Sequence, residues 1–340
     1  MGTIAQIKFY GDPYKVGNMA LQVRIQIFQS TVIPTIYHDI EAWSKISKKD
    51  IENLDKIQRT VLTSIMELPN STPYIGILSE LGIWPVEQLV DYKRIMLLHQ
   101  ITKSKDTRFL KEIIEEQIRD TFSGCWYEQT KEICDKYNLG LQLIKCLSKT
   151  KLKNILKSRI NKRLDMFIKK EAKTKTKLRF CSDFKRKKYT KKGNINFSDA
   201  KCIMKLRLNM TELRSNYKGS IESDICGLCK DKNDTTEHLF ECAEIKKQLG
   251  NVPTAEIIRK DDDDSYEELA KFLKNAYAIR EINSNKTVKE NLVKIQKPVD
   301  IYTVKSTENH GMKIMLSKIK SYSVKNVSDN GMKIVLSKEN

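Results

Sequence analysis

The sequence predicts a mainly α-helical protein, and three kinds of observation support this. Apolar residues recur every three or four positions in three segments, 51–65, 86–97 and 152–167. This spacing places them on one side of a helix. Ser47 is followed three residues later by Asp50, and Ser265 by Glu268, two pairs typical of a helix start. Pro85 stands at a first-turn position, where proline is tolerated.

Three helices are expected in the first hundred residues. The first spans about 20–43, and Pro34 should break or kink it, because proline lacks an N–H and clashes with the preceding turn. The second follows Ser47 and ends at the LPNSTP run of 68–73. Its apolar positions are Ile51, Leu54, Ile57, Val61, Leu62 and Ile65. The third begins at Pro85 and reaches about residue 103.

The middle of the chain is predicted to be helical and strongly basic. Helical patterns cover 107–120 and 126–138, and residues 145–192 contain twenty Lys or Arg against three acids. Within this block, apolar residues recur at helical spacing, namely Leu152, Leu156, Ile160, Leu164 and Phe167. We therefore expect one amphipathic helix with a basic exposed face, and a loss of regular pattern over 169–180. A short apolar helix is expected at 200–208.

The composition points to a polyanionic partner. The formal net charge of the 340-residue chain is +19 and its sequence pI is about 9.4. Nucleic acid is the simplest such partner, and an anionic membrane surface is the alternative. No apolar run is long enough to span a bilayer, and the first residues do not resemble a signal peptide. The eight cysteines do not suggest a disulfide framework, so we expect a nuclear or cytoplasmic protein that is not secreted.

The most specific motif is C-x2-C-x8-H-x3-C, formed by Cys226, Cys229, His238 and Cys242. Thiolate and imidazole are the ligands that Zn²⁺ prefers in a closed tetrahedron. The C-x2-C turn places two sulfurs on one side of an ion, and H-x3-C places the other two ligands one helical turn apart. The alternative is a set of ordinary thiols, but the spacing favours zinc as a structural cofactor. With four protein ligands, the site has no place for a reactive water.

The basic block supplies the candidate contacts to RNA or DNA. A charged helix face is usually only solvated, but such a face normally mixes signs, whereas here bases dominate. We expect phosphate contacts, which give affinity with little sequence choice. The candidates are Arg159, Lys162, Arg163, Lys169, Lys170, Lys185, Arg186, Lys187 and Lys188. The nearby aromatic residues Phe180, Phe184 and Tyr189 are equally suited to stacking on bases or to packing.

The C-terminal part is predicted to contain one helix and a tail. The helix spans about 265–281, with Ser265 and Glu268 as its capping box. Residues 284–340 are polar, and we expect them to be disordered. They contain a short duplication, GMKIMLSK at 311–318 and GMKIVLSK at 331–338, which is too short for a solenoid.

Several segments together resemble one family. Residues 14–43 and 54–101 are similar to the region after the polymerase core in non-LTR (LINE-like) retrotransposon reverse transcriptases. The distinctive pieces are Ile57-Gln58, LPNSTP and the Leu-Gly-Ile-Trp-Pro of 81–85. The Cys-Cys-His-Cys motif looks like the zinc knuckle near the C-terminus of those proteins. The resemblance covers about residues 14–281.

The resemblance implies a division of the chain into five segments. These are a thumb-like helical region (1–104), a basic helical linker (105–200), a zinc module (201–250), a C-terminal helix (251–283) and a disordered tail (284–340). In a full-length element this region would hold nucleic acid behind the polymerase core.

The sequence also departs from the family's enzymes. They polymerise with carboxylates that hold two metal ions, usually in a Tyr/Phe-x-Asp-Asp hairpin, and no such motif occurs here. The acidic run 261–264 is better explained as the N-terminus of a helix. We therefore assign no catalytic residue and expect nucleic-acid binding without polymerisation. The alternative is a transposon-derived structural or protein-interaction protein, whose apolar helix faces at 51–65 and 86–97 bind a protein partner or self-associate.

Overall fold

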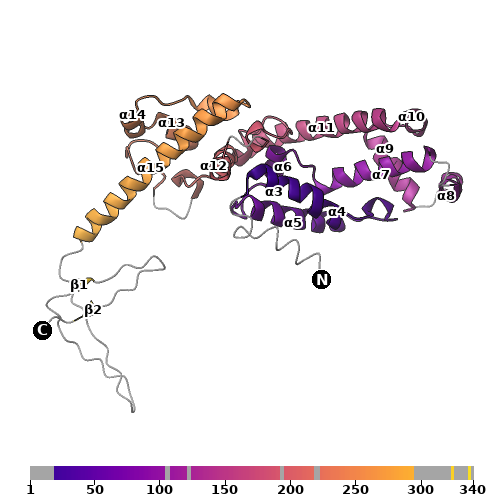
Figure 1. The fold of residues 1–340 in the computed structure, drawn as a ribbon, viewed down its shortest axis with the longest axis horizontal. Coiled ribbons are helices and arrows are strands. Elements are labelled where there is room, and N and C mark those ends of the chain that lie inside the picture. Colours follow the sequence, from indigo (N-terminus) through magenta and orange to yellow (C-terminus); the bar gives the residue numbers. More distant parts are fainter. Residues whose placement is uncertain are drawn as a thin grey trace, which may run out of the picture. The chain divides into compact units, whose positions relative to one another are not determined.

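The computed structural model describes residues 19–103, 108–120, 124–191, 195–217, 223–294, 323–324 and 336–337. The described residues are mainly helical, as the periodicity predicts (Figure 1). The chain divides into two compact units, Met1–Ala278 and Ile279–Asn340. The candidate site residues all lie in the first unit.

The segment around Pro34 remains helical through a local change of geometry. Helix α3 (Leu21–Ile27) continues into a π-helical turn (Phe28–Val32) and then into α4 (Ile33–Ile36). A π turn has a wider hydrogen-bonding pattern, which accommodates the proline that follows it. The helical segment then ends at Ile36, earlier than the predicted residue 43, and a 3-10 turn covers Ile40–Ala42.

The next three helices are α5 (Lys48–Ile65), α6 (Tyr74–Leu81) and α7 (Val86–Lys103). The predicted capping box is confirmed. The Asp50 backbone N–H donates to Ser47 Oγ at 3.2 Å, and the Ser47 N–H donates to the Asp50 carboxylate at 3.0 Å. Helix α6 was not predicted. It ends at Gly82, whose positive φ of 63° and close approach to the Arg186 backbone leave no room for a Cβ.

The apolar stripes of α5 and α7 are partly packed inside this chain. Val61, Leu62 and Ile65 of α5 and Val86 and Val90 of α7 are each at most 4% exposed. Ile57, in the same stripe of α5, is 41% exposed. The interaction hypothesis therefore stays a prediction, with less apolar surface available than the sequence pattern suggests.

The basic region forms α8 (Arg108–Arg119), α9 (Trp126–Lys136), α10 (Leu141–Cys146) and α11 (Lys149–Thr174). Helix α11 runs alongside α7 (Figure 1). Its buried row is Leu152, Leu156, Ile160, Leu164 and Ile168. The prediction was wrong at Phe167, which is 47% exposed, because the buried side repeats every four residues and so reaches Ile168. The helix also continues to Thr174, beyond the predicted loss of pattern at 169.

The C-terminal elements are α12 (Phe197–Arg207), α13 (Thr236–Glu241), α14 (Ala243–Leu249) and α15 (Asp263–Lys294). Further 3-10 turns cover Thr176–Leu178, Lys188–Thr190, Arg214–Tyr217 and Ala255–Arg259. Asp262, not Ser265, begins α15, because its carboxylate accepts the Ser265 backbone N–H at 2.8 Å.

Helix α15 also extends past the predicted boundary at 283. In the tail, β1 (Ser323–Val324) pairs antiparallel with β2 (Leu336–Ser337). The first copy of the GMKI duplication lies outside the described residues.

One hydrophobic cluster extends through the first unit. Its buried members come from each predicted segment between Leu21 and Ala276. A fully buried ion pair also joins distant segments, with Arg207 Nε 2.8 Å from Glu80 Oε2. Tyr189 donates its hydroxyl to the same carboxylate at 2.9 Å. The regions labelled thumb-like, linker and zinc module therefore share one core.

Candidate metal centre and basic surface

A tight turn carries the first two cysteines of the motif. An isolated antiparallel bridge joins Ile225 to Asn233 at its base. The Cys226 backbone N–H donates to the Lys232 carbonyl at 2.8 Å, and the Lys230 N–H donates to the Cys226 carbonyl at 3.0 Å. Lys230 has a left-handed φ of 56°, which closes the turn.

Helix α13 carries the other two candidate ligands. Thr235 caps it, accepting the His238 backbone N–H on its hydroxyl at 3.1 Å. His238 lies in the first turn and Cys242 is the C-cap, and the Cys242 N–H donates to the His238 carbonyl at 2.7 Å. Two ligand groups are thus fixed one helical turn apart.

The four ligand atoms converge on one point. All of them lie within 4.8 Å of one another. Among the described residues, this is the group of His, Cys, Asp or Glu side chains placed closely enough to hold a metal ion. Cys226 Sγ is 4.0 Å from Cys242 Sγ, and Cys229 Sγ is 3.2 Å from His238 Nε2. Two thiolates at about 2.3 Å from a tetrahedral zinc ion are about 3.8 Å apart, which agrees with the first distance. The cluster can therefore hold a metal ion, and its donor set is that of a closed structural site.

The thiols of the cluster are not equivalent. Burial, followed by the neighbouring Cys226, raises the pKa of Cys242 to about 11. Burial also acts to raise the pKa of Cys229. Hydrogen bonds from the backbone N–H groups of Lys232 and Asp231 outweigh it, so the pKa of Cys229 is lowered. A bound metal ion would hold all three sulfurs as thiolates, and binding would release protons.

The cluster is anchored in the main core. Leu239 is fully buried, and the Phe240 ring stacks on Phe272 of α15 with centroids 4.6 Å apart. Leu239 and Phe240 therefore pack in the large core of the chain. Arg179 also pairs with Glu237 at 2.9 Å, which ties α13 to the end of the basic region.

The candidate phosphate contacts on α11 divide into two groups. Lys162, Lys169 and Lys170 are exposed. Arg159 instead donates to the carbonyls of Tyr137 and Asn138, at 2.6 and 2.7 Å. Arg163, although exposed, donates to the Lys136 carbonyl at 2.9 Å. Both arginines thus bind the last carbonyls of α9 and its cap, a favourable place for a cation at a helix C-terminus.

The cluster at 185–188 also divides. Lys185 and Lys188 are exposed, and Arg186 donates to the Thr190 carbonyl at 2.8 Å. Lys187 is only 1% exposed and pairs with Asp183, so the structure corrects its assignment as a phosphate contact. The reason is its backbone N–H, which donates to Glu80 and draws the residue into the core. The neighbouring aromatics Phe180, Phe184 and Tyr189 are at most 4% exposed and serve packing.

Sequence reasoning missed several exposed bases on α11. They are Lys149, Lys151, Lys153, Lys157 and Lys173. Lys149, Lys153 and Lys157 are spaced four residues apart, as are Lys169 and Lys173, so they follow one flank of the helix beside the buried row. That spacing was visible in the sequence and was the signal for this lysine row.

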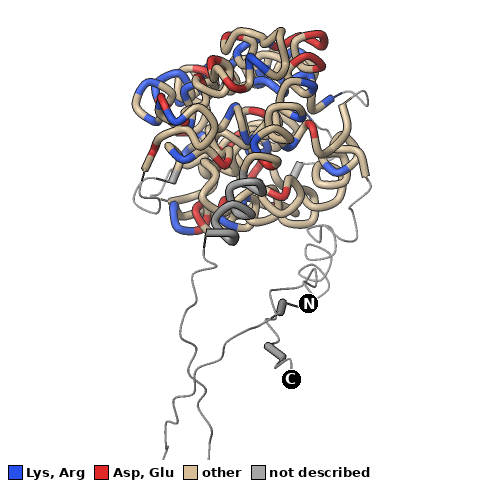
Figure 2. The backbone as a smooth tube through the Cα atoms, turned by 90° about the vertical axis from the view of Figure 1, so that its left-hand side faces the viewer, with Lys and Arg blue, Asp and Glu red and all other residues tan. Residues whose placement is uncertain are grey.

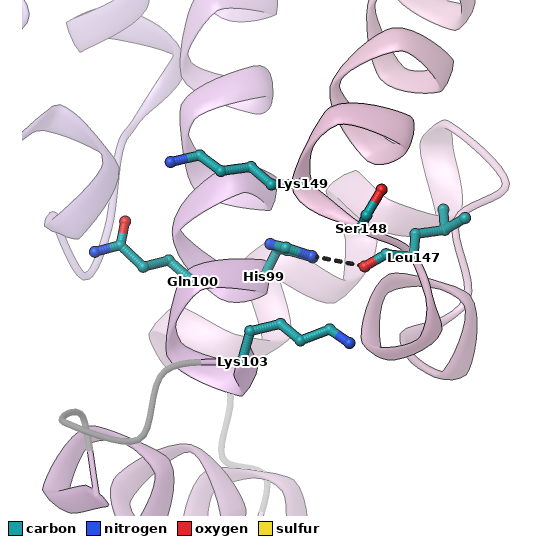
Figure 3. Close-up of a pocket in the computed structure, with 6 residues that line it drawn as sticks. All are labelled: His99, Gln100, Lys103, Leu147, Ser148 and Lys149. Atoms are coloured by element: carbon teal, nitrogen blue, oxygen red, sulfur yellow. Dashed lines mark hydrogen bonds between the residues drawn. The ribbon is translucent and has the colours of Figure 1, made fainter.

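An open pocket of about 420 Å³ lies where the end of α7 meets the start of α11 (Figure 3). His99, Gln100, Lys103, Leu147, Ser148 and Lys149 line it. The His99 ring is 4% exposed, and its Nε2 lies 3.0 Å from the Leu147 carbonyl oxygen. This contact and its burial give His99 a structural role.

Comparisons with protein-family models, with curated proteins and with solved structures find no match to this chain. A search of the described residues finds no helix with the length and hydropathy that a membrane span requires.

Proposed function

We propose that this chain is a zinc-containing nucleic-acid-binding protein, derived from the C-terminal region of a non-LTR retrotransposon reverse transcriptase. In this proposal it holds phosphate backbones on the solvent side of α11 and does not polymerise on its own. The metal centre fixes α13 against the core and takes no part in chemistry.

The observation that carries the proposal is the uncompensated charge of α11. This helix has ten Lys or Arg and two acids, Asp165 and Glu171. The Asp165 carboxylate is turned to the Phe184 backbone N–H at 2.6 Å, and Glu171 pairs with Lys175. Over the described chain as a whole, basic and acidic segments are interspersed (Figure 2). The outer lysines of α11 therefore form a cationic strip along a helix of 26 residues, about 39 Å long.

The acidic run at the start of α15 supports a role without polymerisation. Asp261 accepts the Lys188 backbone N–H at 2.9 Å and the Tyr266 hydroxyl at 3.1 Å. Asp262 caps the helix through Ser265. These contacts account for two of the acids structurally, as the sequence interpretation proposed.

The proposal is tested by fluorescence-anisotropy titration of the purified chain against labelled RNA, DNA and hybrid duplexes over a range of salt. The triple variant Lys157/Lys162/Lys169→Gln removes three exposed charges from α11. The control Lys48/Lys56/Lys274→Gln removes three exposed charges from α5 and α15.

If α11 holds duplex phosphates, the first variant should reduce the slope of log K against log salt by up to about 2.7, since each neutralised phosphate contributes about 0.9. The control should change it much less. Equal losses for both variants would reject α11 as the contact surface, and no binding by the unmodified chain would reject the proposed function.

A further inference from the structure

An aromatic ring is exposed on α11 between Arg163 and Lys170. Phe167 is 47% exposed, and its neighbour Met166 is 58% exposed. The core contacts of this turn are made instead by Leu164 and Ile168, which are 5% and 0% exposed. Neither exposed side chain is therefore needed to complete the buried row of the helix.

Two bases and one acid neighbour Phe167 on the helix surface. Arg163 precedes it by one turn, and Lys170 follows it by nearly one turn. Glu171 follows it by one turn and is paired with Lys175. Arg163 is held in place by the Lys136 carbonyl at 2.9 Å, and its guanidinium carbon lies 5.7 Å from the centre of the Tyr137 ring. An apolar surface at this place would meet the same polyanion that the lysines attract.

A second exposed phenylalanine of the described residues has different neighbours. Phe109 of α8 is 73% exposed. The turns that follow it carry Glu115 and Glu116, which would repel a phosphate chain. Of these two phenylalanines, Phe167 is therefore the one with a base on the turn before it and on the turn after it.

We propose that Phe167 is a stacking platform for an unpaired base, so that the preferred ligand of α11 is single-stranded nucleic acid. This inference rests on the proposed function above. In this proposal the lysines contact the phosphates and the Phe167 ring stacks on the face of a base. In a duplex that face is covered by the neighbouring base pairs, so it is accessible only in a single strand. Base–aromatic stacking is tolerant of sequence because every base has a π-face. The selectivity is therefore for strand state and not for sequence.

The test compares Phe167→Ala with the matched control Phe109→Ala on a single-stranded oligonucleotide and on a duplex of the same length. A stacking contact contributes about 1–3 kcal/mol, which is a loss of roughly 5- to 150-fold in affinity. We expect this loss for Phe167→Ala on the single strand only, with an unchanged salt slope. Phe167→Trp should retain the affinity, and Phe109→Ala should bind both ligands as the unmodified chain does.

A direct readout is the fluorescence of 2-aminopurine placed in the single strand, which stacking on Phe167 should quench and Phe167→Ala should restore. Full single-strand affinity in Phe167→Ala would overturn the inference while leaving the proposed function intact. So would an equal loss on the duplex. Because the side chain is half-exposed, circular dichroism should show the variant to be folded, and an unfolded variant would show that the ring serves packing.

Discussion

Substitution of Cys242 tests whether the metal centre stabilises the fold. Cys242 is 1% exposed and ends α13. The substitution Cys242→Ser leaves three ligands for the ion, and we expect the purified variant to contain no tightly bound zinc. Cys146→Ser is the matched control, because Cys146 is an exposed thiol outside the cluster.

The magnitude follows from the way in which α13 is attached. A helix of six residues is not stable alone, and Leu239 and Phe240 place it in the main core. Loss of the ion should therefore lower the stability of the whole first unit. Linkage gives about 2.7 kcal/mol at a free metal concentration of 100 times Kd and about 4.1 kcal/mol at 1,000 times. At roughly 2–4 °C per kcal/mol, Tm should fall by about 5–16 °C.

The assay is thermal unfolding followed by circular dichroism, together with metal analysis by mass spectrometry. The unmodified chain and Cys146→Ser should each hold one zinc ion and lose stability when a chelator is added. Cys242→Ser should start at the lower Tm and not respond to the chelator. Stoichiometric zinc in Cys242→Ser, or a Tm of the unmodified chain that ignores the chelator, would refute the reasoning.

Three further predictions concern the core around these sites. Phe240→Ala should lower the free energy of unfolding in urea by about 3–5 kcal/mol, because it leaves a cavity where a buried ring was. Ile225→Ala, at an exposed position, should lower it little. Similar losses for both variants would show that α13 is not anchored in the core. Glu80→Gln should lower the free energy of unfolding by about 3–5 kcal/mol, since it leaves the Arg207 cation buried without its carboxylate partner. The added substitution Arg207→Met should recover much of this loss. Additive effects of the two substitutions in a double-mutant cycle would contradict this prediction. Lys201 and Arg24 outweigh the partial burial of Glu67 and lower its pKa. The contribution of ionised Glu67 to folding stability is therefore present above the ordinary glutamate pKa, and it is lost as the pH falls through the lower folded value. Glu67→Gln should therefore flatten the acid limb of stability against pH, and an unchanged limb would exclude this group.

The metal centre could be predicted because its geometry is local. Cys226 and Cys242 are 16 residues apart, and one turn and one short helix bring all four ligands together. The signals for both are short-range, namely the C-x2-C spacing and the cap before His238. The long helices α5, α7 and α11 could be predicted for the same reason, because a periodic stripe is a property of consecutive residues.

The availability of the basic residues could not be predicted in this way. Periodicity tells which side of a helix is apolar, but it does not tell what the other side meets. Arg159 and Arg163 bind the end of α9, more than twenty residues away in sequence, and Lys187 is buried beside Glu80 of α6. Counting charges alone made these residues candidate phosphate contacts on the same basis as the exposed lysines.

The sequence by itself thus determined the helical class, the four residues that could hold a metal ion and the basic character of α11, because each depends on a short stretch of chain. The tertiary structure decided which bases face solvent, that Ile168 and not Phe167 completes the buried row, and that one core unites the segments. These depend on contacts between residues as far apart as Glu80 and Arg207, 127 positions, which only the packed chain brings together.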